Sequence, residues 1–137
     1  MYPEELVSPM REDLTSVGVQ EMKTATEVDQ VLATKEGTTL VIVNSVCGCA
    51  AANARPAVKL AMQHSKTPGK FTTVFAGQDT EAVAKARSYM APFPPSSPSI
   101  ALFKDGNLVH FIERHHIEGR AAEAIAANLT AAFDEYC

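Results

Sequence analysis

The chain has 137 residues, of which 46% are hydrophobic and 20% are charged, and its net charge is −4 at pH 7. A chain of this size and composition buries enough apolar surface to fold as one domain, residues 1–137, without disulfide or metal staples. Its 12 Lys and Arg residues form no cluster, which argues against nucleic acid and anionic membranes as partners.

The first residues place acidic side chains where a secretory signal needs basic and then apolar ones. No apolar run approaches the roughly 18 residues that cross a membrane. We therefore expect a cytoplasmic protein. Structural disulfides are rare in that compartment, so closely spaced cysteines there indicate redox catalysis or metal binding.

The first part of the chain predicts two helices and a buried strand. Residues 4–16 carry apolar side chains at helical spacing, and residues 17–22 are a candidate edge strand. Thr24 and Glu27 fit a capping box that begins a helix running to about residue 35. Residues 38–45 are β-branched and apolar without alternation, which is typical of a strand buried on both faces.

The middle of the chain continues this alternation of helix and strand. A helical pattern runs from Ala50 to about Ser65 and contains Pro56, which must kink the helix or lie in an irregular first turn. Residues 71–77 predict a second strand. A further helix follows, for which Asp79 is a plausible cap.

The last part of the chain predicts a hairpin and a closing helix. A proline-dense loop at residues 92–99 leads into strands at 100–104 and 108–113, joined by a tight turn. Helical spacing of apolar residues returns from Gly119 to Tyr136. The order of elements predicts an α/β fold with a central mixed sheet flanked by helices on both faces.

Cys47 and Cys49 lie where the buried strand gives way to a helix. The first amides of a helix lack intrahelical partners and the helix dipole is positive there, so the position favours a thiolate. Cys47 precedes the helix and is the candidate nucleophile. Residues i and i+2 of a helix point to nearly opposite sides, so a Cys47–Cys49 disulfide needs non-helical backbone, which Gly48 can supply. Such a small ring is strained and should exchange readily.

A strand that enters a cysteine motif at a helix start, followed by a kinking proline and a later proline loop, resembles the thioredoxin fold. The segments NSVCGCA, PPSSPSIALF and VHFIERHHIEGR are similar to the bacilliredoxin family, thioredoxin-fold proteins with a Cys-Gly-Cys motif. The similarity runs from about Glu4 to the terminal cysteine. It implies a cis bond between Ser97 and Pro98 in a loop beside the cysteines.

The resemblance also implies an activity, that of a thiol–disulfide oxidoreductase which removes bacillithiol from mixed disulfides on client proteins. Cys47 would attack the mixed disulfide, and Cys49 or a second low-molecular-weight thiol would resolve the adduct. Bacillithiol is then the thiol substrate, and we expect no tightly bound cofactor and no resident metal. Val46 replaces the aromatic residue that often precedes a thioredoxin motif, which favours thiol exchange or isomerase-like activity over general disulfide reduction.

Two alternatives for the cysteine pair stay open. Both cysteines can be small core residues of a non-catalytic interaction domain. They can also bind zinc or Cu(I), with a further ligand from a histidine or from the C-terminal cysteine, although structural zinc sites usually contain two cysteine pairs. The possible further ligands are His110, His115, His116 and Cys137. The two adjacent histidines are expected to diverge.

The sequence leaves two alternatives for most of the residues that could support the cysteine pair. Arg55 lies near the motif and either lowers the Cys47 pKa or points to solvent. Cys137 is expected to fray at the terminus, with a role as a resolving thiol as the alternative. Residues 114–116 are expected to form a solvated turn, or to offer one side chain to the anionic part of a thiol substrate. His110 is expected to lie on a polar sheet face.

Overall fold

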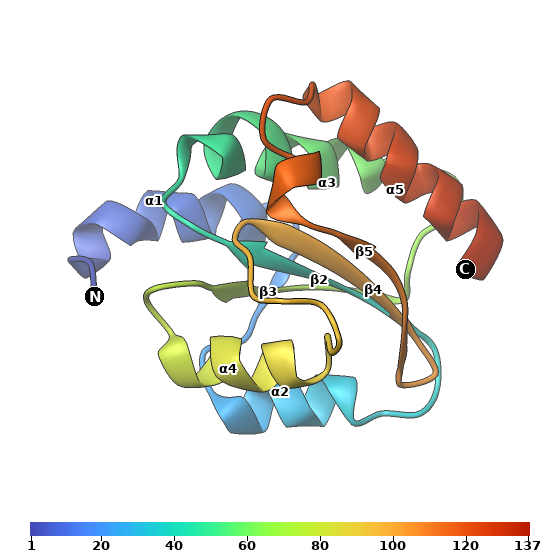
Figure 1. Cartoon of the computed structure of the whole chain (residues 1–137), viewed down its shortest axis with the longest axis horizontal. Coiled ribbons are helices and arrows are strands. Elements are labelled where there is room, and N and C mark those ends of the chain that lie inside the picture. The colour runs from blue at the N-terminus through green and yellow to red at the C-terminus, as the bar shows by residue number, and fades with distance from the viewer.

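A mixed five-stranded sheet forms the middle layer of the protein in a computed structural model that describes residues 1–137 (Figure 1). Its spatial order is β1-β3-β2-β4-β5. Strands β1, β3 and β2 run parallel to one another, β4 runs antiparallel to β2, and β5 runs antiparallel to β4. The strands are β1 (Gln20–Glu21), β2 (Thr38–Asn44), β3 (Lys70–Phe75), β4 (Ser99–Lys104) and β5 (Asn107–Ile112). The predicted edge strand and hairpin are both confirmed.

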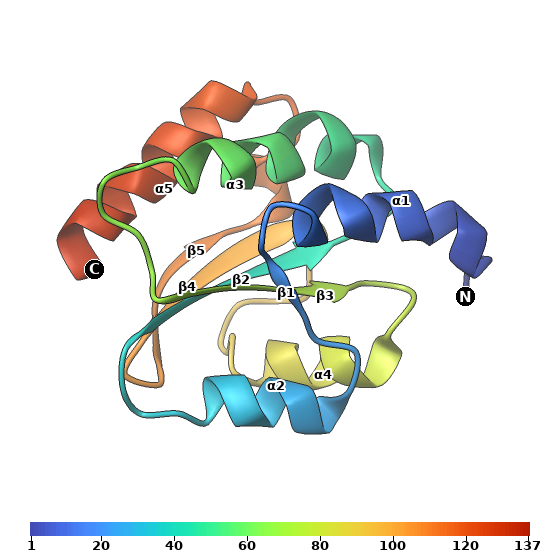
Figure 2. The same ribbon diagram turned by 180° about the vertical axis from the view of Figure 1, so that it is seen from behind.

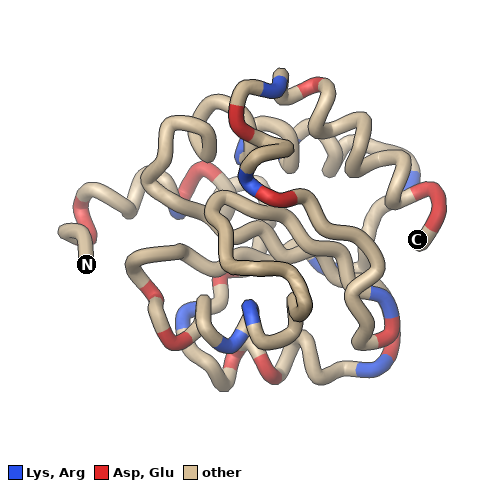
Figure 3. The backbone as a smooth tube through the Cα atoms, viewed as in Figure 1, with Lys and Arg blue, Asp and Glu red and all other residues tan.

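Helices cover both faces of this sheet (Figure 2). On one face lie α2 (Ala25–Leu32) and α4 (Thr80–Ser88), and on the other lie α1 (Glu4–Thr15), α3 (Arg55–Ala61) and α5 (Ala122–Tyr136). The predicted α/β architecture is therefore confirmed. Basic and acidic positions lie interspersed around this fold (Figure 3). None of the helices combines the length and apolar character that a bilayer crossing requires.

β2 is the central strand because both of its faces are covered. Leu40 and Ile42 lie in the apolar cluster under α3 and α5, whereas Val41 and Val43 lie in the cluster under α2 and α4. All four side chains are fully buried. This two-sided burial explains the apolar run without alternation, and it fixes the strand whose end carries the cysteine pair.

Local capping signals were predicted with mixed success. The Thr24 hydroxyl accepts the Glu27 N–H at 3.1 Å, which confirms Thr24 as the cap, whereas the Glu27 carboxylate accepts the N–H of Lys23, one residue before the cap, at 3.1 Å. Asp79 occupies the cap position of α4 but makes no cap hydrogen bond. Its carboxylate binds Arg11 instead, so Asp79 is the cap residue by position, as predicted, but its side chain does not cap the helix.

Pro56 lies in an irregular first turn, the second of the two outcomes predicted for it. Residues Ala50–Ala54 form a π-helix, η1, in which the Arg55 N–H bonds the Ala50 carbonyl, one residue further back than in an α-helix. Pro56 has no N–H to donate, and its ring would collide with the carbonyl of Ala52 in a regular helix. The extra residue in the turn accommodates the proline. The helix that follows, α3, ends earlier than predicted.

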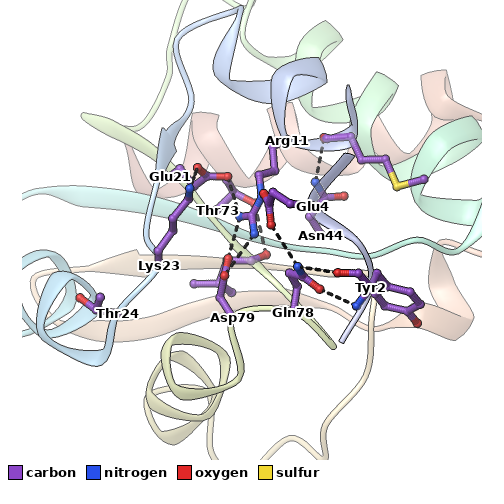
Figure 4. A network of polar contacts seen from close by, with 12 residues as sticks. Tyr2, Glu4, Arg11, Glu21, Lys23, Thr24, Asn44, Thr73, Gln78 and Asp79 are labelled. Carbon is purple, nitrogen blue, oxygen red and sulfur yellow. Dashed lines mark hydrogen bonds and ion pairs between the residues drawn. The ribbon is translucent and has the colours of Figure 1, made fainter. Parts of the chain in front are cut away.

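Arg11, on α1, is buried among three carboxylates at the edge of the sheet (Figure 4). Its Nε donates to Glu4 at 2.8 Å and its Nη1 to Glu21 at 2.9 Å. Asp79 accepts from Nη1 at 2.7 Å and from Nη2 at 3.1 Å. The hydrogen bond that Arg11 donates to Asp79 is the largest cause that raises the pKa of Arg11. This buried cation therefore links α1 to β1, through Glu21, and to the start of α4, through Asp79.

We expect Arg11→Met to lower the free energy of unfolding by about 3 kcal/mol, because it leaves three carboxylates without their shared cation. Lys85→Met is the matched control, since its Nζ lies 3.4 Å from Asp29 in an exposed pair that contributes about 0–1 kcal/mol. Urea denaturation of the reduced proteins at pH 7 measures both. Equal losses in the two variants would contradict a dominant role for the Arg11 network.

Candidate active site

The cysteine pair lies just beyond the C-terminal end of β2, at the start of a helix. Helical backbone begins at Gly48 and continues into η1, slightly earlier than predicted. The Cys47 carbonyl accepts the N–H groups of Ala50 and Ala51, at 2.9 and 3.3 Å. Cys47 therefore directly precedes the first helical turn. The N–H of Cys49 points at the Cys47 sulfur, with the two atoms 3.4 Å apart, so a helical amide faces the sulfur.

The two thiols of this site differ in acidity. The hydrogen bond from the Cys49 thiol is the largest cause that lowers the pKa of Cys47, followed by the Cys49 N–H and, further on, the charge of Arg114. Burial raises the pKa of Cys49, which is 8% exposed, and the neighbouring Cys47 sulfur raises it further. The geometry thus favours a thiolate at Cys47 and a protonated thiol at Cys49, which makes Cys47 the stronger nucleophile.

Arg114 supplies the positive charge next to Cys47, a role that the sequence did not reveal. Its Nη2 lies 3.3 Å from the Cys47 sulfur. Nε donates to the Glu118 carboxylate at 3.0 Å, and Nη1 donates to the Ser97 carbonyl at 3.3 Å. The hydrogen bond to Glu118 raises the pKa of Arg114, so the guanidinium stays charged. The 114–116 segment is an exposed turn, η2 (Arg114–His116), but its first side chain faces the cysteine site.

Arg55 does not point to solvent, because it is 5% exposed, so that alternative was wrong. The nearby charge that lowers the pKa of Cys47 is that of Arg114. The Nε of Arg55 donates to Asp13 at 2.8 Å. Its Nη1 donates to the Asn44 side chain at 3.0 Å and to the Ser45 carbonyl at 3.3 Å. Arg55 therefore anchors the end of β2 from which the cysteine turn begins.

The proline loop lies against the same arginine that faces Cys47. The Ser97–Pro98 bond is cis, as the resemblance implied, and a second cis bond joins Ala91 to Pro92, which was not predicted. Arg114 contacts this loop twice, through the Ser97 carbonyl and through its own N–H, which the Ser96 hydroxyl accepts at 3.4 Å. The structure thus brings Ser97 and Pro98 to the site together with Cys47.

Cys137 is not brought to the site, and it does not fray as predicted. Its N–H bonds the Phe133 carbonyl at 2.8 Å, and its side chain packs against the apolar cluster. His64, beyond the end of α3, contacts Asp134 near the end of α5 at 2.8 Å. Cys137 therefore lies near the C-terminal end of α3, whereas Cys47 precedes the helical segment that leads into the start of α3. The C-terminus is marked at the end of α5 in Figures 1 and 2.

The side chains that gather in metal-binding geometry do not include a cysteine. Three ligand atoms lie within 4.8 Å of one another, and they belong to Glu113, His115 and His116. The two histidine rings converge, with centroids 4.0 Å apart, rather than diverge as predicted. His110 contacts Asn128 at 2.6 Å. The structure therefore adds no histidine ligand to the cysteine pair.

Comparison with known proteins gives one consistent result. The family model described as disulphide isomerase matches residues 2–137. A protein named bacilliredoxin from Cytophaga hutchinsonii is 56% identical over 98% of this chain and 99% of its own. Bacilliredoxins from Koribacter versatilis and Halalkalibacterium halodurans are 53% and 54% identical, over 100% and 99% of this chain and 94% of each of their own.

Solved structures show the same fold at low sequence identity. Thioredoxin from Fasciola hepatica superposes with a TM-score of 0.60 at 18% identity, covering 87% of this chain and 100% of its own. Thioredoxin from Malassezia sympodialis gives 0.56 at 18% identity, covering 87% and 90%. The fold is therefore thioredoxin-like, as the resemblance implied.

We expect the alkylation of Cys47 by iodoacetamide to rise with pH earlier than that of free cysteine. A thiolate forms only above its pKa, so a lowered pKa moves this rise to lower pH. Cys49→Ala should move it back towards higher pH by more than Arg114→Gln, because the Cys49 thiol is the larger cause. Tandem mass spectrometry that locates the alkylated sulfur, in a Cys137→Ser background, separates the rate at Cys47 from that at Cys49.

The control for these two variants is Lys104→Gln, an exposed residue on β4 that removes the same charge as Arg114→Gln. It should leave the pH profile unchanged. A wild-type profile that coincides with that of free cysteine would show that the donors around Cys47 do not activate it.

Proposed function

This chain belongs to the bacilliredoxin family, and we propose that it removes bacillithiol from mixed disulfides on client proteins. Family membership and a thioredoxin-like fold give it the coarser role of a thiol–disulfide oxidoreductase. The observation that carries the finer proposal is the Cys47 sulfur, which faces the Cys49 N–H and the Arg114 guanidinium at once. These donors favour the thiolate that disulfide exchange requires.

In the proposed first step, the Cys47 thiolate attacks the bacillithiol sulfur of the mixed disulfide. A bond forms between these two sulfurs, the bond to the client sulfur breaks, and the client leaves as a thiolate. Cys47 then carries bacillithiol as a mixed disulfide. The adduct has no charge on the Cys47 sulfur, so one of the causes that raise the pKa of Cys49 disappears when Cys49 is needed.

Two routes resolve the adduct. The Cys49 thiol loses its proton and attacks the Cys47 sulfur, which releases bacillithiol and forms a Cys47–Cys49 disulfide. Alternatively, the thiolate of a second bacillithiol attacks the sulfur of the bacillithiol bonded to Cys47. This step restores the Cys47 thiolate and releases bacillithiol disulfide. The first route leaves an oxidised protein that a further thiol must reduce.

Disulfide isomerisation is the second candidate function. The description of the family model favours it, and so does the spacing of the two cysteines, since Cys49 lies in the helix that begins at Gly48 whereas Cys47 precedes it. A disulfide across one intervening residue closes a very small ring, so the oxidised pair must distort this turn. A strained disulfide passes to another thiol more readily than an unstrained one.

The reaction is tested with a client that carries one bacillithiol mixed disulfide. We expect wild type to release the client thiol, Cys49→Ser to release it while retaining the adduct on Cys47, and Cys47→Ser to be slower by about 100-fold or more. Intact-mass spectrometry follows both proteins. Release by Cys47→Ser at the wild-type rate would exclude Cys47 as the nucleophile. The same client modified with glutathione is the substrate control, and equal rates for the two clients would indicate general thiol exchange.

Gly48 offers a way to separate the two resolving routes. In the reduced structure its φ is not positive, and an added Cβ would meet nothing within 4 Å. The reduced site therefore does not need glycine. The backbone freedom of Gly48 becomes useful only when the turn opens to join Cys47 and Cys49.

Gly48→Ala should leave the unfolding free energy of the reduced protein unchanged or raise it by up to about 1 kcal/mol. It should also disfavour the Cys47–Cys49 disulfide, measured as the oxidised fraction in dithiothreitol redox buffers. Gly119→Ala is the control for stability, because a φ of +76° predicts a loss of about 1 kcal/mol there. If Gly48→Ala oxidises as readily as wild type, the turn does not limit disulfide formation.

A further inference from the structure

A cleft of about 210 Å³ opens between β5 and α5. Its apolar wall includes Phe111, Ile112 and Ile125, and its polar wall includes His116, Arg120 and Asn128. No acidic side chain lines it. The cleft therefore combines hydrogen-bond donors and an arginine with an apolar wall, a combination typical of binding sites for small anionic molecules.

The polar groups of this cleft are available to a ligand. The backbone carbonyl of Arg120 accepts a hydrogen bond from the Asn53 side chain, while its guanidinium takes part in none of the ion pairs of the chain. Asn128 turns its Oδ1 to His110, at 2.6 Å. The amide N–H groups of Asn128 are therefore left to donate elsewhere, and the Arg120 guanidinium lacks a carboxylate partner.

The cleft begins close to the cysteine site on two sides. Arg114 contacts the Cys47 sulfur, and His116 lines the cleft two residues further along the same turn. Residues two apart in such a 3-10 turn lie closer together than the about 7 Å that two residues of extended chain span. On the other side, Asn53 belongs to the π-helix that follows the cysteines, and it holds the backbone of Arg120. A flexible group bonded to the Cys47 sulfur therefore reaches the cleft if it is several atoms long.

We propose that this cleft binds the anionic part of the low-molecular-weight thiol while its sulfur is bonded to Cys47. The ligand class is a thiol with a carboxylate several atoms from its sulfur, and Arg120 is the residue that selects it, with His116 and Asn128 as further donors. Arginine pairs with a carboxylate through two parallel hydrogen bonds. This proposal rests on the proposed function and names the feature of the thiol that the site recognises.

The charge balance at the site favours the same class of ligand. In the free protein the Arg114 guanidinium lies 3.3 Å from the Cys47 sulfur, where it favours the thiolate over the thiol. In the adduct the Cys47 sulfur is neutral, so the basic segment from Arg114 to Arg120 has lost one negative neighbour. A carboxylate brought by the adduct replaces that lost charge, whereas a neutral thiol does not.

A pair of model thiols of equal length tests the proposal. One client cysteine is modified with 6-mercaptohexanoate, which carries a carboxylate, or with 6-mercaptohexanol, which is neutral. We expect Arg120→Gln to raise KM about ten-fold for the carboxylate adduct, leave its kcat nearly unchanged, and leave both constants unchanged for the neutral adduct. Lys104→Gln is the matched control, because it removes the same charge from an exposed position on the hairpin.

The length of the thiol distinguishes binding in the cleft from a general effect of the charge of Arg120. The short adduct of 3-mercaptopropionate carries the same charge but does not extend to Arg120, so its KM should not respond to Arg120→Gln. Equal responses to the long and short carboxylates, or no response to either, would overturn the proposal. If Arg120→Gln removes bacillithiol with a wild-type KM, the proposal that the cleft binds the thiol is overturned, but the proposed function is not. Selection of 6-mercaptohexanoate by a wild-type protein that does not release bacillithiol would overturn the proposed function alone.

Discussion

One buried cation, Arg55, holds together the elements that meet at the cysteine site. It begins α3, and its guanidinium reaches α1 through Asp13 and the end of β2 through Asn44. Asn44 in turn donates to the carbonyl of Met10 on α1. Because β2 is covered on both faces, packing fixes its direction. Arg55 holds the end of the strand in place through the Asn44 side chain and the Ser45 carbonyl. The turn that carries Cys47 thus starts from a rigid point.

The chemistry at that point comes from an asymmetry between two neighbouring thiols. Cys47 faces donors, whereas Cys49 is buried and is itself one of those donors. In the reduced state Cys47 directly precedes the helix, which begins at Gly48, and Cys49 lies in its first turn. Hydrogen bonds to the Cys47 thiolate stabilise the reduced form, and a form stabilised in this way makes its disulfide a better oxidant. The same contacts therefore activate the nucleophile and favour transfer of a disulfide to another thiol.

The C-terminal part of the chain completes the site. The antiparallel hairpin of β4 and β5 returns the chain to the start of the cysteine helix, where Arg114 meets Cys47 and the cis-proline loop. The π-helix that accommodates Pro56 also places Asn53 against the backbone of Arg120. An irregularity required by one proline thus joins the cysteine helix to the segment that leads into α5, and it lies beside the cleft.

The sequence by itself determined the order of the elements, the Thr24 and Glu27 cap, a kink or irregular turn at Pro56 and the position of Cys47 at a helix start. Each depends on residues within a few positions of one another, so local rules suffice. Tertiary structure alone decided the partners of the arginines. Arg114 and Cys47 are 67 residues apart in the sequence. The Asp79 carboxylate binds Arg11 and does not cap its own helix. A long side chain reaches any neighbour that the fold supplies, and a buried cation takes the carboxylates nearest to it. Sequence spacing contains no information about that choice.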